Sequence, residues 1–235
     1  MDDLLDRGDD HPGRGVGVLD PDLGTPVEQL PYAGDPSPLV LPPDEVRARL
    51  GEPEAKILDH IDDHFRHFIA HSPFLTMATA DAAGRADCST RGDYPGFVKV
   101  LDERTLAIPD RPGNKIADSF RNLAENDGIG LLLLIPGLRE TLQINGRAYP
   151  TDEADALARM RTEAREPILA LVVEVAEAYF HCGRALIRAR LWDPASQALA
   201  DEMPSAGETV TGQLGLDVDP EVIDRGLEAG YRKLY

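Results

Sequence analysis

The sequence predicts an α+β fold, mainly β with helices, in which an antiparallel β-barrel is decorated with helices. Six or more segments after residue 73 have the alternating or β-branched composition of strands. Short turns at residues 81–84 and 102–104 join several of them as hairpins, which pair antiparallel. A continuous apolar run at residues 129–135 indicates a strand covered on both faces, and short helical patterns separate the strands.

The predicted elements group into four parts. Residues 1–43 are rich in Asp, Gly and Pro and show no sustained period, which predicts an irregular acidic arm. Residues 44–72 form a helical extension, residues 73–195 the barrel domain, and residues 196–235 a helical tail packed on that domain. A Ser-Pro pair ends the extension, whose apolar face is Ile57, Leu58, Ile61, Phe65, Phe68 and Ile69.

The strands and helices of the barrel domain follow from hydrophobic period and turn residues. Strands are expected at residues 74–80, 85–90, 97–101, 105–108, 129–135, 140–149 and 168–175, the last continuing towards residue 180. Helices are expected at residues 114–124, 152–161, 181–191 and near 220–233.

Acidity limits the ligands that the chain can attract. The formal net charge is −18 at pH 7 and the pI is about 4.6. Nucleic acid and anionic membranes are therefore not expected as partners, because both are bound through basic surfaces. An anionic ligand needs a local cationic pocket, and Arg91, Arg111 and Lys115 lie within one stretch of the sequence.

The same composition predicts a cytoplasmic location. No apolar run is long enough to span a membrane, and the acidic first six residues lack the order of a secretory signal. The two cysteines, Cys88 and Cys182, cannot form a disulfide framework and lack metal-type spacing. They are expected to be reduced and structural.

Arg91 is the first candidate for anion binding. It follows Ser89 and Thr90 at a predicted strand end, where a guanidinium can form bidentate hydrogen bonds to phosphate. The alternative is a surface arginine paired with Asp87 or Asp93.

The turn at residues 112–115 is the second candidate, because a helix N-terminus offers free N–H groups to an anion. Asn114 could instead serve only as the N-cap of that helix. Lys115 in the first turn opposes the helix dipole, and a bound phosphate would relieve that penalty.

Four histidines are expected along one stripe of the first helix: His60, His64, His67 and His71. A pair four residues apart can ligate zinc. No Cys or Glu completes a metal motif, so a subunit or arm contact is the preferred interpretation and no metal is predicted. The sequence also lacks a Gly-x-Ser-x-Gly motif, a P-loop and paired carboxylates, which argues against hydrolase and nucleoside triphosphatase chemistry.

Taken together, several segments resemble the pyridoxamine 5′-phosphate oxidase-like, FMN-binding split-barrel superfamily, in particular bacterial members with an N-terminal helical extension. The C-terminal Arg-Leu-His-Asp-Arg signature of true pyridoxamine phosphate oxidases is absent, so the resemblance is to the superfamily rather than to those oxidases. The matching segments are residues 72–81, 88–97, 108–115, 121–123, 140–148, 179–188 and 191–194.

The resemblance implies a six-stranded antiparallel split β-barrel of the FMN-binding type, and a homodimer with two FMN molecules at the subunit interface. In relatives the first strand of the site faces the flavin and its phosphate, the next loop lines the flavin edge and holds the phosphate, and a later strand approaches the ring. A C-terminal segment can reach the cofactor of the other subunit. The implied cofactor-binding residues are Ser89, Thr90, Arg91, Pro109, Asp110, Arg111, Asn114, Lys115, Thr141, Gln143, Arg188 and Trp192.

The function implied first is that of an FMN-dependent oxidoreductase acting on a small-molecule substrate or electron donor. Arg91 or Arg188 would stabilise the reduced flavin, and Tyr94, Phe97 and Trp192 would line the open face of the isoalloxazine. No catalytic residue is assigned.

A second possibility is a non-catalytic carrier or sensor that binds flavin, deazaflavin F420 or haem, with His181 as the residue on which a haem would depend. A third is a dimer scaffold without a ligand, against which the cationic cluster argues.

Overall fold

The computed structural model describes residues 41, 45–46, 56–113, 116–162 and 166–234. The chain divides into two compact units, Met1–Pro53 and Glu54–Tyr235, and nearly all described residues belong to the second. Among the described residues, no helix is both long and apolar enough to cross a membrane.

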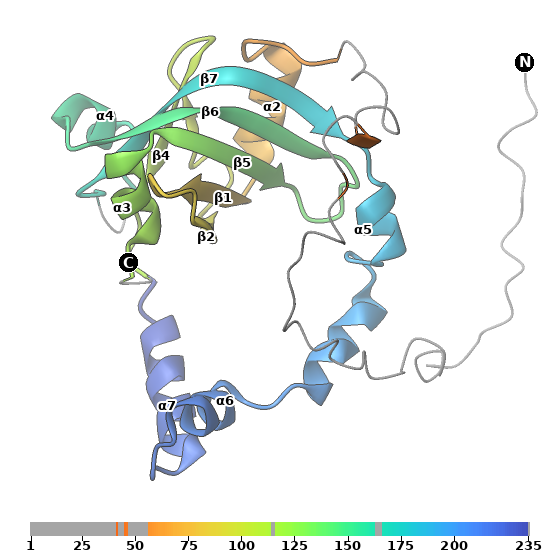
Figure 1. The fold of residues 1–235 in the computed structure, drawn as a ribbon, viewed down its shortest axis with the longest axis vertical. Coiled ribbons are helices and arrows are strands. Elements are labelled where there is room, and N and C mark those ends of the chain that lie inside the picture. Colours follow the sequence, from red (N-terminus) through yellow and green to blue (C-terminus); the bar gives the residue numbers. More distant parts are fainter. Residues whose placement is uncertain (1–40, 42–44, 47–55, 114–115, 163–165, 235) are drawn as a thin grey trace, which may run out of the picture. The chain divides into compact units, whose positions relative to one another are not determined.

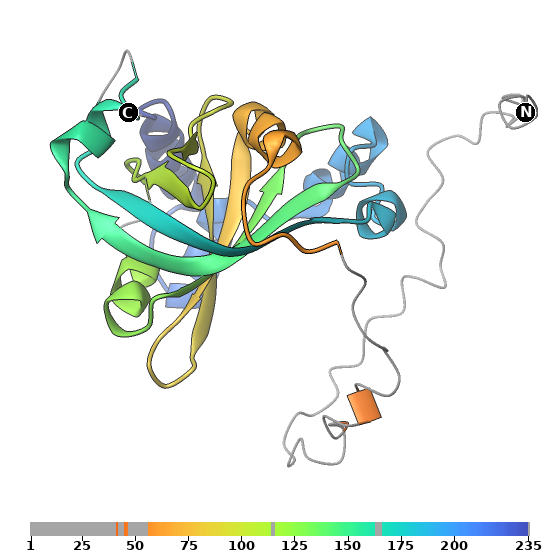
Figure 2. The ribbon, with the colours of Figure 1, turned by 90° about the horizontal axis from the view of Figure 1, so that it is seen from above.

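One antiparallel sheet of seven strands forms the centre of the second unit (Figures 1 and 2). The strand order is β2-β1-β5-β6-β7-β4-β3, so β2 and β3, which residues 93–98 connect, lie at opposite ends of the order. The strands are β1 Phe74–Ala80, β2 Ala86–Gly92, β3 Lys99–Val100, β4 Thr105–Pro109, β5 Gly128–Leu134, β6 Thr141–Thr151 and β7 Ala170–His181.

This sheet confirms the predicted fold class. It has seven strands rather than six. The shortest of them, β3, pairs with β4 over two residues only, Lys99 and Val100. The strand expected at residues 97–101 is therefore much shorter than its apolar pattern suggests. Phe97 and Val98, which produced that pattern, are buried side chains of the preceding loop.

Helix α2, Asp63–His71, begins later than the apolar pattern predicts. Asp62 caps it by accepting a hydrogen bond from the Phe65 N–H at 2.8 Å. Leu58 forms an isolated antiparallel bridge with Ala178 of β7, so a helix through residues 57–58 was the wrong prediction. A β-bridge and a helix face both bury an apolar residue, which is why the pattern did not separate them.

Helix α3, Asp118–Glu125, also starts later than expected. Its N-cap is Ala117, with a left-handed φ of 58°, whereas Asn114, the cap that the sequence suggested, lies outside the described residues. The short helices α4, Ala154–Ala158, and α5, Arg184–Arg188, lie within the predicted helical segments, but His181 ends strand β7 instead of starting a helix.

The C-terminal region contains a 3₁₀-helix, Pro194–Glu202, followed by α6, Ala206–Leu214, and α7, Pro220–Tyr231. Helix α7 agrees with the prediction, whereas α6 was missed. Ser205 and Glu208 form a capping box at its start, a Ser-x-x-Glu signal that the sequence does carry.

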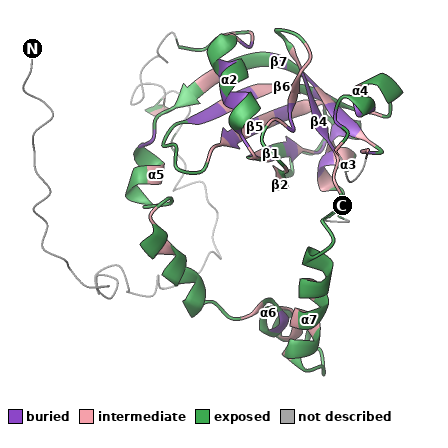
Figure 3. Ribbon diagram, turned by 180° about the vertical axis from the view of Figure 1, so that it is seen from behind, coloured by how far each residue is buried: buried purple, intermediate pink, exposed green. Residues whose placement is uncertain are grey.

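The hydrophobic core is formed mainly by side chains of the sheet, whose strands carry most of the buried residues (Figure 3). Burial alternates along β1 and β5, so each buries every second side chain completely and leaves the others half-buried or exposed. Strand β5 is thus fully covered on one face only, not on both. Helix α2 adds Phe65, Phe68 and Ile69 to the same core.

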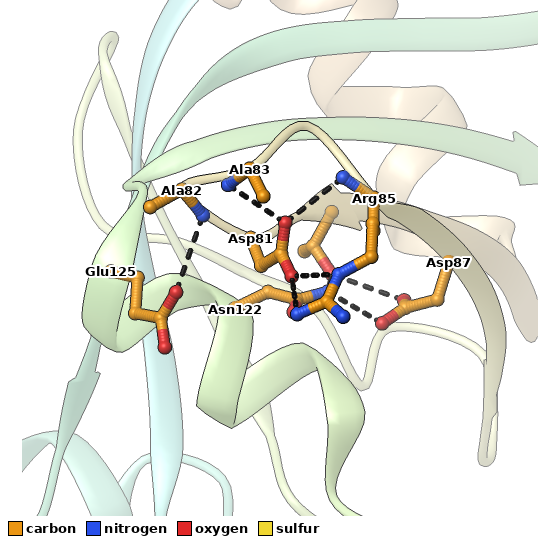
Figure 4. A network of polar contacts seen from close by, with 8 residues as sticks. Asp81, Ala82, Ala83, Arg85, Asp87, Asn122 and Glu125 are labelled. Atoms are coloured by element: carbon orange, nitrogen blue, oxygen red, sulfur yellow. Dashed lines mark hydrogen bonds and ion pairs between the residues drawn. The ribbon is translucent and has the colours of Figure 1, made fainter.

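A polar network attaches α3 to the β1–β2 hairpin (Figure 4). The Asp87 carboxylate accepts hydrogen bonds from Thr79 Oγ1 at 3.0 Å and from Asn122 Nδ2 at 2.6 Å. At the turn of the hairpin, Asp81 accepts from the backbone N–H and the guanidinium of Arg85. The network holds the middle of α3, through Asn122, against strands β1 and β2.

Candidate functional site

Arg91 lies on β2, an edge strand, opposite the buried Leu75 of β1. Its Nη1 donates to Ser89 Oγ at 3.0 Å and to the Thr90 carbonyl oxygen at 2.8 Å, and its Nη2 lies 3.5 Å from Ser119 Oγ. A surface depression of about 300 Å³ includes Arg91, Ser89 and Asp118 in its lining. The guanidinium therefore has hydroxyl and carbonyl partners around it.

The two carboxylates considered as ion-pair partners of Arg91 are engaged elsewhere. Asp87 accepts from Thr79 and Asn122, and Asp93 pairs with Arg111 at 2.6 Å. Among the described residues, Arg91 forms no ion pair with a carboxylate. Neither Asp87 nor Asp93 neutralises Arg91, so this alternative is wrong. The charge of the Arg91 guanidinium remains available to a ligand.

Ser119, in the first turn of α3, completes this cluster. Its side chain is buried, and its hydroxyl lies 2.9 Å from Ser89 Oγ. The N-cap of α3 makes no side-chain hydrogen bond, and the first N–H groups of a helix have no partner within the helix itself. Sequence reasoning missed Ser119, because a serine near a helix start usually indicates only a cap.

Asp110 follows strand β4 and lies within electrostatic reach of Arg91. Burial raises the pKa of its carboxyl, while the nearby charges of Arg91 and Arg111 lower it. Its backbone N–H bonds to the Leu169 carbonyl oxygen at 2.9 Å, which fixes the chain at the strand end. The structure thus brings Ser89, Arg91 and Asp110 together.

Arg111 belongs to a different environment. Its Nε donates to Asp93 at 2.6 Å and its Nη2 to the Met160 carbonyl oxygen at 2.8 Å; the side chains of Arg111 and Asp93 are 12% and 1% exposed. This buried ion pair forms part of the wall of a cavity of about 590 Å³. Tyr94, Phe97, Lys99 and Arg161 also line it.

Gln143 and Thr141 lie on one face of β6. Gln143 Oε1 is 2.5 Å from His181 Nε2 of β7, and Gln143 Nε2 donates to Asn145 Oδ1 at 3.1 Å. Thr141 pairs in register with His181 and is buried. His181, which sequence reasoning considered only for haem, is therefore in contact with a predicted cofactor-binding residue.

The remaining predicted residues are dispersed. Arg188 is exposed at the end of α5, and Trp192 donates through Nε1 to the Leu138 carbonyl oxygen at 2.7 Å. Pro109 is buried at the end of β4, and Thr90 contributes a carbonyl oxygen rather than its side chain to the Arg91 cluster. Asn114 and Lys115 lie outside the described residues.

The histidine stripe is broken, because His60 precedes α2 and bonds through Nδ1 to Asp59 at 2.9 Å. The rings of His67 and His71 lie 4.3 Å apart. Within the part of the chain that the structure describes, no three His, Cys, Asp or Glu side chains are grouped to hold a metal ion.

Several solved structures are similar to this chain. HupZ of Group A Streptococcus is 14% identical, with a TM-score of 0.43, and the match covers 51% of this chain and 93% of HupZ. An FMN-binding protein from Syntrophomonas wolfei is 13% identical, with a TM-score of 0.38, covering 49% and 86%. HutZ, the heme storage protein from Vibrio cholerae, is 15% identical, with a TM-score of 0.37, covering 52% and 94%.

No curated protein matches the sequence. The family model described as pyridoxamine 5′-phosphate oxidase matches residues 61–182, from the residues just before α2 to the end of β7. This match spans more than half of the chain and includes all seven strands of the sheet. The chain therefore belongs to the pyridoxamine 5′-phosphate oxidase family.

Proposed function

We propose that the protein binds FMN and acts as an FMN-dependent oxidoreductase. The observation that carries the proposal is Arg91, a guanidinium without a carboxylate partner among the described residues, beside two hydroxyls and an uncapped helix start. In a chain of net charge −18, a cation at this position that forms no ion pair favours a local anion site. The flavin phosphate is an anion of the required kind.

The donor set fits a phosphate monoester. Arg91 supplies charge-assisted hydrogen bonds, Ser89 and Ser119 supply hydroxyls, and the first turn of α3 supplies backbone N–H groups. Asn114 and Lys115, from the resemblance, remain proposed members of the same site. Bound FMN would supply the hydride and electron chemistry, while these residues hold and orient it.

The cavity beside Arg111 is the proposed substrate side. Its volume of about 590 Å³ falls within the usual range of small-molecule sites, and it contains Tyr94 and Phe97, two of the three residues expected to line the substrate face. Trp192 is not among its lining residues. The buried Asp93–Arg111 pair fixes the shape of the wall.

The positions of Arg91 and Gln143 on opposite faces of the sheet support a homodimer. Arg91 shares a face with Leu75, Leu133 and Leu142 across the paired strands, whereas Gln143 shares the opposite face with Thr90. Successive side chains of a strand alternate between faces. A single copy therefore does not present Arg91 and Gln143 to one ligand, but two copies with FMN between them would.

A second candidate is a non-catalytic binding protein for flavin, F420 or haem. The described residues in contact with Arg91 include no nucleophile or acid–base pair, which suits a carrier as well as an enzyme. A haem bound through His181 would have to use Nδ1, because Nε2 is engaged with Gln143.

The absorbance spectrum of the purified full-length protein, before and after addition of FMN, tests both candidates. A flavin spectrum that NAD(P)H bleaches and oxygen restores with turnover supports the oxidoreductase. A flavin that binds but is not turned over by any reductant supports the carrier. A Soret band, or no flavin binding at all, contradicts the FMN proposal.

A further inference from the structure

Four polar side chains form a continuous chain across the face of β6 and β7. The Asn145 Nδ2 group donates to Glu177 Oε2 at 3.1 Å, and Gln143 Nε2 donates to Asn145 Oδ1 at 3.1 Å. The chain ends at His181, whose Nε2 lies 2.5 Å from Gln143 Oε1. Asn145 and Glu177 are directly paired in the sheet, and Thr141 is paired with His181.

The carboxylate sets the direction of every hydrogen bond in this chain. A carboxylate only accepts, so Asn145 must turn its NH₂ group to Glu177 and its oxygen to Gln143. The oxygen of Asn145 then requires the NH₂ group of Gln143, which leaves the oxygen of Gln143 for His181. His181 must donate through Nε2–H, because two acceptors would repel each other.

The same reasoning leaves the other imidazole nitrogen as an acceptor. A neutral imidazole protonated on Nε2 carries its lone pair on Nδ1. In the part of the chain that the structure describes, His181 Nδ1 has no hydrogen-bond partner. The ring of Tyr179 lies 5.2 Å from the imidazole between centroids and supports its orientation.

We propose that His181 accepts, through Nδ1, a hydrogen bond from the ring N–H of the bound flavin, and that Gln143, Asn145 and Glu177 are its positioning residues. The inference rests on the proposed function, since it needs FMN on this face of the sheet. It assigns a flavin-binding role to His181, which the sequence analysis considered as a haem ligand. Glu177 acts on the ligand through three intervening side chains, those of Asn145, Gln143 and His181.

The tautomer of His181 is measurable without any cofactor. Long-range ¹H–¹⁵N correlation spectra of the full-length protein at about pH 9, well above the usual imidazole pKa of about 6.5, distinguish Nε2–H from Nδ1–H. We expect His181 to be Nε2–H. His60 and His71 are internal controls of the opposite kind, because their Nδ1 atoms bond to the Asp59 carboxylate and the His67 carbonyl oxygen.

Two variants test the positioning role. Glu177→Gln removes the group that sets the direction, so His181 should change to a mixture of both tautomers. Glu174→Gln, on the same strand but outside the chain of hydrogen bonds, should leave His181 unchanged. A His181 that is Nδ1–H in the wild type, or that responds equally to both variants, overturns the inference.

Addition of FMN then separates this inference from the proposed function. If FMN binds and the Nδ1 resonance of His181 shifts upfield, both are supported. His181→Leu should weaken FMN binding by about threefold to tenfold, the value of one hydrogen bond, and His181→Asn, which retains an acceptor near the position of Nδ1, should restore most of it. FMN binding without a shift of Nδ1 overturns the role of His181 alone, whereas a failure to bind FMN overturns both.

Discussion

Replacement of Arg91 by alanine is the most direct test of the proposed phosphate site. Of the five guanidinium N–H groups, both on Nη1 are used within the protein and one on Nη2 makes a long 3.5 Å contact. Two donors therefore remain for an anion. One charge-assisted hydrogen bond is worth about 1.5–3 kcal/mol, so Arg91→Ala should weaken FMN binding by about 10- to 150-fold.

The variant should fold normally, which makes the binding measurement interpretable. Ser89 and Ser119 remain bonded to each other at 2.9 Å, so no buried hydroxyl loses its last partner. Thermal unfolding of the cofactor-free protein checks this expectation. The quenching of flavin fluorescence on titration with protein then gives the dissociation constant.

Arg121→Ala is the matched control for Arg91→Ala. Arg121 lies on α3, and its replacement also removes one positive charge. Its side chain is 72% exposed and forms only a long surface ion pair with Asp118, at 3.9 Å. Because exposed charges are screened by salt, its effect on FMN affinity should stay below about threefold. Equal effects of the two variants, or an unchanged affinity in Arg91→Ala, would refute the assignment of Arg91 to the phosphate.

Three further predictions concern stability. Gly146 follows a shift in the β6–β7 register, a β-bulge between Asn145 and Gly146. Gly146→Ala would place a Cβ 2.0 Å from a backbone oxygen of β7 and should prevent stable folding, whereas Gly212→Ala, where a Cβ meets nothing within 4 Å, should stabilise α6 by up to about 1 kcal/mol. Similar melting temperatures of the two variants would contradict the register at this bulge. Asp93→Leu leaves the Arg111 guanidinium buried without its carboxylate and should cost about 3–5 kcal/mol in urea unfolding, and a loss under about 1 kcal/mol would count against a buried pair. The backbone N–H of Arg85 and then its guanidinium lower the pKa of Asp81 from 3.8, so its stabilising effect is present above that value and is lost as the pH falls. The difference in unfolding free energy between wild type and Asp81→Asn should shrink between about pH 5 and about pH 2, and a constant difference would contradict this cause.

The sequence was most informative where a residue pattern is compatible with only one type of secondary structure. Alternation along β1 and β5 located both strands, because a half-buried strand buries every second side chain. Leu58 and Phe97 were assigned to the wrong elements for the opposite reason. Each is an apolar residue held by a bridge or a loop, and hydrophobicity alone does not distinguish such positions from a helix or a strand.

The candidate site was only partly predictable from the sequence. The contact between Ser89 and Arg91 could be anticipated, since the two residues are near neighbours on one strand, but their role in binding an anion stays a prediction. The partner of Arg111 could not be inferred, because Asp93 lies 18 residues away and the cavity that both residues line is a property of the tertiary fold. Ser119 and His181 became recognisable only when β2 met α3 and β6 met β7.

The order of the strands has a geometric consequence for the connection formed by residues 93–98. Seven strands laid flat would be about 29 Å wide between the outer two, at about 4.8 Å per spacing. The seven Cα steps from Gly92 to Lys99 reach at most about 25 Å when fully extended. A flat sheet is therefore unreachable for this chain. Because the connection is shorter than the width of a flat sheet, the sheet must curl to bring β2 and β3 closer together. The length of the connection therefore limits how far the barrel can open.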